Sequence, residues 1–155
     1  MTGDRRSLAL FTAASACGLL HALPSFYWAS GGTAWLDTVG AFAVDMAASG
    51  DPGVALMLLA VGVAKAAGAL VPLADHARPP MHRWIRAVSW VGAAVIVAWG
   101  GAGVVGAWIG LLTGATSWAQ PAVVGHALLW DPLFTLWGVV LAVALWSSRP
   151  PGTGR

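Results

Sequence analysis

The sequence predicts an all-α, polytopic membrane protein: a bundle of four transmembrane helices, with an amphipathic helix on the outer surface between the first two. Its 155 residues are 58% hydrophobic and only 9% charged, whereas soluble domains carry about 25% charged residues. The apolar residues gather in four long stretches, and nearly all charges lie outside them. The length allows one compact unit, so we expect a single transmembrane domain over residues 1–155.

Each of the four apolar stretches is long enough to cross a bilayer core of about 30 Å at about 1.5 Å per residue. The predicted spans cover residues 8–28, 52–73, 87–112 and 123–146. Asp51 is a suitable N-cap for the second span, and Pro52 suits its first helical position.

The basic residues outside the spans predict the orientation. They precede the first span, surround the connection between spans two and three, and follow span four: Arg5, Arg6, Arg78, Arg83, Arg86, Arg149 and Arg155. The other two connections contain no Lys or Arg, so the positive-inside rule places both termini in the cytoplasm. The net charge of +2 is too small to indicate nucleic-acid binding.

Two processing signals are weakly matched near the N-terminus. Arg5-Arg6 loosely resembles a twin-arginine signal, and the residues before Cys17 loosely resemble a lipoprotein cleavage site. Apolar sequence continues past Cys17 to residue 28, which favours an uncleaved first span. Cys17 is the single cysteine, so no intramolecular disulfide is expected.

The connection between spans one and two has a helical pattern. One predicted face carries Trp35, Leu36, Val39, Phe42, Ala43 and Met46. Asp37 and Asp45 fall on the other face. The pattern predicts an amphipathic helix over residues 34–48 on the outer membrane surface, where it serves either as a spacer or as a lid over a site.

Three ionisable side chains, His21, Lys65 and Asp131, lie deep inside the spans. Such groups are costly in a bilayer core and mark candidate functional sites. Counting residues places His21 and Asp131 roughly 12 Å beneath the outer interface, with Lys65 roughly 7–8 Å deeper. We expect Lys65 to lean toward Asp131 and pair with it, with His21 nearby. His126 lies about 140° around the helix from Asp131 and is expected to be interfacial.

Two prolines adjoin this layer, Pro24 after His21 and Pro132 after Asp131. Each removes a helix hydrogen bond and favours a kink. Kinks at one level on two helices predict a cavity in the outer half of the bundle.

Ten tryptophans are a large excess for this length. Seven fall near the ends of the spans, as in interfacial aromatic belts: Trp28, Trp35, Trp84, Trp90, Trp108, Trp118 and Trp146. Trp99, Trp130 and Trp137 lie deeper, where they either pack against lipid and core or form an aromatic wall around an apolar or cationic ligand. With Trp28, Trp35 and His126, they are the candidate substrate-binding residues.

Other motifs are few. Gly103, Gly106 and Gly110 favour close helix packing, within the bundle or between copies in a homo-oligomer. No metal-ligand spacing, phosphate loop or dinucleotide motif is present, so no metal or cofactor is expected.

Two stretches resemble a known family. Leu20-His21, the run from Phe26 to Gly32 and Trp35-Leu36-Asp37 resemble the first-span signature of a bacterial, actinobacterial-type family of small four-helix integral membrane proteins, a domain-of-unknown-function family. Trp130-Asp131-Pro132-Leu133 resembles its last-span aromatic-x-Pro-Leu pattern. The resemblance implies the fold and a location in the bacterial plasma membrane, and it implies no activity. Membrane terpene cyclases and sterol isomerases are similar only in kind, without an aligned motif.

These observations favour a small membrane enzyme or binder for a lipophilic, isoprenoid-like substrate. As a cyclase or isomerase, it would use Asp131 as a neutral carboxylic acid that protonates an alkene or epoxide. Tryptophans would stabilise the cation, His21 would accept the final proton, and Lys65 would tune the pair. If Lys65 ionises Asp131, then Asp37 or Asp45 becomes the candidate acid. The alternatives are a non-enzymatic accessory subunit, whose buried polar groups fix helix pairing, and a component of an oligomeric transporter.

Overall fold

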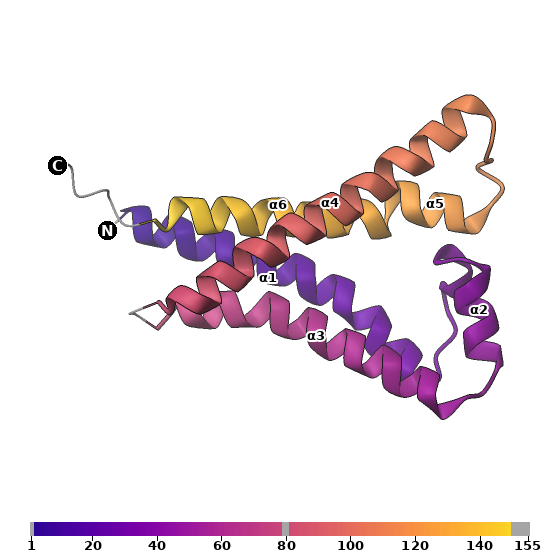
Figure 1. Ribbon diagram of the computed structural model, residues 1–155, viewed down its shortest axis with the longest axis horizontal. Helices are drawn as coiled ribbons and strands as arrows, with labels where there is room; N and C mark the ends of the chain where they lie inside the picture. The colour runs from indigo at the N-terminus through magenta and orange to yellow at the C-terminus, as the bar shows by residue number, and fades with distance from the viewer. Residues whose placement is uncertain (1, 79–80, 150–155) are drawn as a thin grey trace.

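A computed structural model describes residues 2–78 and 81–149, and all regular structure within them is helical (Figure 1). The elements are α1 (Thr2–Ala29), η1 (Leu36–Thr38, a 3-10 helix), α2 (Ala41–Ala48), α3 (Pro52–His76), α4 (Arg83–Thr113), α5 (Pro121–Leu128) and α6 (Trp130–Ser147). Four segments are long and apolar enough to cross a membrane: Arg5–Ala29, Pro52–His76, Arg83–Thr113 and Pro121–Ser147. The prediction of four long apolar helices is therefore confirmed, and their length and composition are those of a multi-pass membrane protein.

The helix ends follow local rules. Asp51 caps α3 as predicted, because its Oδ1 accepts a hydrogen bond of 2.8 Å from the Gly53 amide, and Pro52 occupies the first turn. Gly114 ends α4 in the left-handed conformation with a φ of 73°. These ends depend on neighbours in the sequence, so they were predictable without the fold.

Helix α1 lies against both α3 and α6, and α4 lies along α6. Small residues allow the close approaches. Gly18 of α1 faces the Trp137 ring and the Ala69 methyl, and Gly138 of α6 faces the Ala93 carbonyl. The buried core consists of Phe11, Ala14, Ala69, Ala93, Trp137, Leu141, Ala144 and Leu145. The core therefore joins all four spans.

The bundle is closed at one end and spread at the other. The start of α1 and the end of α6 lie at the closed end, whereas α3 and α4 diverge toward the end that carries η1, α2 and α5 (Figure 1). We call the spread part the open half. The three ionisable residues predicted deep inside the spans lie there.

The predicted helix over residues 34–48 is wrong as one element. It divides into η1 and α2 at Gly40, whose φ of 133° is incompatible with a helix. The two parts face differently: Leu36 is buried, whereas Phe42 is 78% exposed. The apolar spacing over residues 34–48 fits one helix, but η1 packs against α5. This tertiary contact accompanies the break at Gly40, and the spacing does not record it.

Span four is also interrupted. Helix α5 ends at Leu128, Leu129 has a φ of −124° and a ψ of −70°, and α6 begins at Trp130. Pro132 lies in the first turn of α6, where its missing N–H cannot bond to the Leu128 carbonyl. Helix α1, in contrast, continues through Pro24. The predicted pair of kinks is thus one clear break and one continuous helix.

Candidate functional site

A cavity of about 230 Å³ lies in the open half between α1, α3 and α6. It is lined by His21, Pro24, Trp28, Val39, Lys65, Trp99, His126, Trp130, Asp131 and Phe134. The predicted cavity beside His21 and Asp131 is present, and it includes all three ionisable residues expected within the spans. We call it the polar cavity.

An apolar groove of about 780 Å³ runs along α4 and α5. It is lined by Val95, Ala98, Trp99, Ala102, Gly103, Ala107, Ala122, Val123, His126 and Asp131. The groove and the polar cavity share Trp99, His126 and Asp131. Asp131 therefore stands where a mainly apolar surface meets a polar pocket, which is a common composition of ligand sites.

His126 is the hydrogen-bond partner of Asp131, with 2.9 Å between His126 Nδ1 and Asp131 Oδ2. The prediction that these two side chains lie far apart around one helix and that His126 is merely interfacial is wrong. It assumed a continuous helix, but the break at Leu129 turns the two residues toward each other. Asp131 thus has a partner five residues away.

The Val39 carbonyl group determines which protons the His126–Asp131 pair carries. His126 Nε2 lies 3.1 Å from the Val39 carbonyl oxygen, which can only accept, so Nε2 must carry a proton. The bond between Nδ1 and Oδ2 then contains one further proton. The pair is either neutral imidazole with a carboxylic acid or imidazolium with a carboxylate, and it is net neutral in both forms.

A glycine makes room for the carboxylate. Asp131 is 7% exposed, and a methyl group at Gly103 would overlap its Oδ2. Thr135 Oγ1 donates to the Asp131 carbonyl over 2.8 Å. Of the predicted glycine face, Gly103 therefore packs inside the chain, whereas a methyl group at Gly106 would meet no described atom outside its own helix backbone within 4 Å. The homo-oligomer stays a prediction.

Lys65 does not pair with Asp131, contrary to expectation. Its Nζ donates to Ser25 Oγ at 3.1 Å and to the His21 carbonyl at 3.5 Å. The ion pairs found between described side chains join histidines to aspartates, and none includes Lys65. The reason is topological, since α3 packs against α1, whereas Asp131 of α6 faces α4.

His21 lies between the lysine and the aromatic residues. Its ring is 4.6 Å from the Phe134 ring and 6.1 Å from the Trp130 ring, between centroids. Its Nδ1 is buried and has no hydrogen-bond partner among the described residues. A buried nitrogen without a partner calls for an explanation, and a bound ligand is one.

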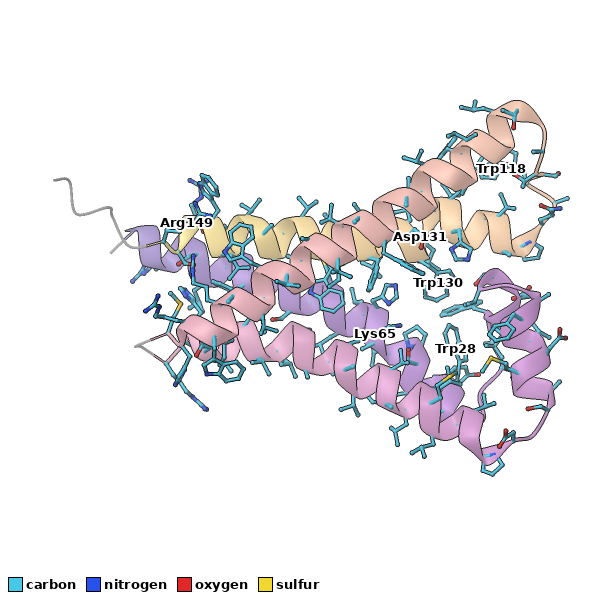
Figure 2. The ribbon with its side chains drawn as sticks, in the orientation of Figure 1. Trp28, Lys65, Trp118, Trp130, Asp131 and Arg149 are labelled. Atoms are coloured by element: carbon cyan, nitrogen blue, oxygen red, sulfur yellow. The ribbon has the colours of Figure 1, made fainter. Side chains whose placement is uncertain are left out.

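Trp28 and Trp130 form a wall of the polar cavity, edge to face at 5.7 Å (Figure 2). Each indole also holds the connection after α1. Trp28 Nε1 donates to the Ala34 carbonyl at 2.9 Å, and Trp130 Nε1 donates to Thr38 Oγ1 at 3.0 Å. With the His126 bond to Val39, these contacts fasten residues 34–39, which we call the cap segment, over the site.

The remaining predicted site residues are distributed unevenly. Trp99 lines both the polar cavity and the groove and is 73% exposed. Trp137 is in the core, lines neither, and is 2% exposed. Trp35, Asp37 and Asp45 are exposed and line neither. The structure therefore brings together Asp131, His21, Lys65, His126, Trp28, Trp130 and Trp99.

The sequence did not predict that Val39, Thr38 and Gly103 contribute to the site. Thr38 and Val39 act mainly through one hydroxyl and one carbonyl group, and Gly103 acts by lacking a side chain. None of these has a sequence signature. The one available signal was Asp131-Pro132, which indicates an interrupted helix and thus a changed direction for His126.

These features define a class: a small multi-pass membrane protein with an aromatic, polar cavity in its open half. Residues 18–141 match the family described as Protein of unknown function (DUF3995), so the chain belongs to that family. The matched region contains every residue of the polar cavity. No curated protein and no solved structure matches the chain.

Proposed function

We propose that this protein binds a lipophilic small molecule in the joined polar cavity and groove, and that the His126–Asp131 pair protonates it. The observation that carries the proposal is the position of Asp131. Its carboxyl group lines both compartments and shares one proton with His126. A proton donor at the edge of an apolar groove is suited to a substrate that is itself apolar.

We further propose that both termini lie in the cytoplasm of a bacterial cell and that the open half faces outward. The positive-inside rule supports this orientation, because the described arginines lie near the helix ends that meet at the closed end: Arg5, Arg6, Arg78, Arg83, Arg86 and Arg149. The groove then opens to the outer half of the bilayer. A lipophilic ligand would enter laterally from the lipid.

The proposed chemistry is acid-initiated isomerisation or cyclisation of an alkene, such as an isoprenoid. Asp131 transfers its proton to one alkene carbon, and the other becomes a cation next to the faces of Trp28, Trp130 and Trp99. The cation then loses a proton from a neighbouring carbon to the Asp131 carboxylate, which restores the His126–Asp131 pair.

Binding is tested by blocking the groove. Ala102 lines the groove, whereas Ala94 is exposed on the same helix and lines neither compartment. We expect native mass spectrometry of the purified protein to find a bound lipophilic molecule in the wild type and in Ala94→Trp. We expect its occupancy to fall by about tenfold or more in Ala102→Trp. Equal lipid content in all three proteins would contradict the site.

Catalysis is tested with Asp131→Asn. The amide N–H that this substitution introduces can donate to His126 Nδ1, so the variant keeps the hydrogen bond but carries no acidic proton. We expect ligand binding and thermal stability close to those of the wild type, together with complete loss of conversion of alkene lipids extracted with the protein. Full conversion by this variant would exclude Asp131 as the acid.

A second function is supported by a specific observation: both His126 nitrogens already have protein partners, Asp131 and Val39. The pair would then fasten the cap segment and fix helix packing in a non-enzymatic accessory subunit. This function predicts purified protein without lipid, and an Asp131→Leu variant that is less stable by about 1 kcal/mol. Lipid bound in the wild type would exclude it as the sole function.

A further inference from the structure

Lys65 lines the polar cavity with donor capacity that no described residue uses. An ammonium group has three N–H donors, and the two acceptors found for Nζ are Ser25 Oγ and the His21 carbonyl. No described carboxylate lies within ion-pair distance of it. The protonated side chain is therefore an unpaired positive charge in a half-buried position, and such a charge favours an anion as its neighbour.

His21 supplies a second unused group in the same cavity. Its Nδ1 is buried without a hydrogen-bond partner among the described residues, and its carbonyl positions the Lys65 amine. In the tautomer with a proton on Nδ1, the ring donates into the cavity beside the lysine. The other ionisable lining residues, His126 and Asp131, bond to each other and form a net neutral pair.

We propose that Lys65 and His21 bind the carboxylate head group of a lipophilic acid, whose apolar chain passes Asp131 into the groove. This inference rests on the proposed function, since it specifies the ligand of the same site. The lining carries one unpaired cation, which matches a monovalent carboxylate. A phosphate monoester carries about −1.5 to −2 charges at neutral pH and would leave excess negative charge next to Asp131.

The volumes support a ligand that occupies both compartments. Ligand pockets usually measure about 300–1,000 Å³, so the polar cavity of about 230 Å³ holds a head group and the start of a chain. The groove of about 780 Å³ holds the remainder. Because Asp131 lines both, the carbon that it protonates would lie near the head end of the chain.

The test compares chain-matched ligands that differ only in the head group. Dodecanoic acid, dodecanol and dodecyl phosphate compete against a fluorescent undecanoic acid probe on the 155-residue protein in nanodiscs of zwitterionic phosphatidylcholine. We expect the wild type to bind the acid at least about tenfold more tightly than the alcohol, and more tightly than the phosphate. The alcohol measures the contribution of the chain alone.

Variants of Lys65 separate charge from packing. Lys65→Met keeps most of the side-chain length and removes the charge. We expect this variant to bind the acid only as tightly as it binds the alcohol. Its affinity for the alcohol should equal that of the wild type. Lys65→Arg keeps the charge and should keep the preference for the acid. Ala94→Trp, at an exposed position that lines neither compartment, is the control and should also keep it. Thermal unfolding of each variant establishes that it is folded.

The outcomes distinguish this inference from the proposed function. If the acid and the alcohol bind the wild type equally, or if the phosphate binds best, the carboxylate assignment is overturned while the lipid site stands. If Lys65→Met lowers the affinities for acid and alcohol by the same factor, Lys65 is structural and the inference is overturned. If neither ligand binds the wild type, the proposed function fails as well.

Discussion

Asp131 is buried among groups that control its position and its proton. His126 shares the proton, Gly103 leaves space for the carboxylate, and Thr135 bonds to its backbone carbonyl. A carboxyl group on a membrane helix is costly unless partners compensate it. Here the compensation is specific, so small changes around the carboxylate should act on the whole site.

Gly103→Ala tests this tight fit. The new methyl group would overlap Asp131 Oδ2, so we expect the carboxylate to shift, the His126 bond to break, and the protein to lose about 1–3 kcal/mol of stability. Thermal unfolding in detergent and ligand binding measure the two effects. Gly106→Ala is the matched control, since a methyl group at that position of the same helix would meet no described atom outside the helix's own backbone within 4 Å. Equal effects in both variants would show that helix flexibility, not the fit to Asp131, is the cause.

At the scale of elements, the main feature is the docking of the cap segment onto α5 and α6. His126 donates to the Val39 carbonyl, Trp130 donates to Thr38, and Gly125 of α5 lies against the Thr38 backbone. The break between α5 and α6 makes this possible, because it presents His126 and Trp130 to the same segment. The cap segment therefore closes the polar cavity through contacts that also orient the proton-carrying pair.

Gly125→Ala tests the docking. Its methyl group would overlap the Thr38 carbonyl oxygen, a backbone atom with little freedom to move. We expect the cap segment to separate from α5, with faster amide hydrogen exchange at residues 36–39 and little change in α1 and α3. Gly92→Ala, at an open position on α4, should leave the exchange unchanged. Unchanged exchange in Gly125→Ala would show that the segment is held elsewhere.

At the scale of the whole molecule, the two ends of the bundle are built differently. At the closed end, Arg149 lies 3.8 Å from the Trp146 ring centroid, and Arg86 bonds to Ser148 Oγ and the Leu145 carbonyl. Figure 2 shows Arg149 at this end and Lys65, Trp130 and Asp131 in the open half. These contacts and the nearby hydrophobic core hold the helices together at the closed end. The helices can therefore diverge around a cavity at the other end while the fold is kept.

The proposed orientation predicts which connections face the cell exterior. In a Cys17→Ala background, we expect Ser49→Cys and Ser117→Cys to react with a membrane-impermeant maleimide in intact cells. Ala77→Cys should react only after the cells are lysed. All three positions are exposed, so accessibility differs by membrane side and not by burial. Labelling of Ala77→Cys in intact cells would reverse the orientation.

The sequence by itself determined the all-helical class, the four spans and the cap at Asp51. These features depend on apolar length and on neighbours along the chain, which a sequence records directly. It also identified Asp131, His21 and Lys65, because an ionisable group within an apolar stretch is visible without a fold. Motifs in the first and last spans resemble a family of unknown function, and this resemblance was confirmed over residues 18–141.

Only the tertiary structure decided the partners of these residues. Lys65 bonds to α1 because α3 packs there, and Asp131 bonds to His126 because Leu129 breaks a helix that periodicity treats as continuous. The division of residues 34–48 likewise results from the docking of η1 on α5. The spacing of apolar residues along the sequence predicts the direction of each side chain around one uninterrupted helix. The distance between side chains of different helices depends on helix breaks and on packing, which this spacing does not record.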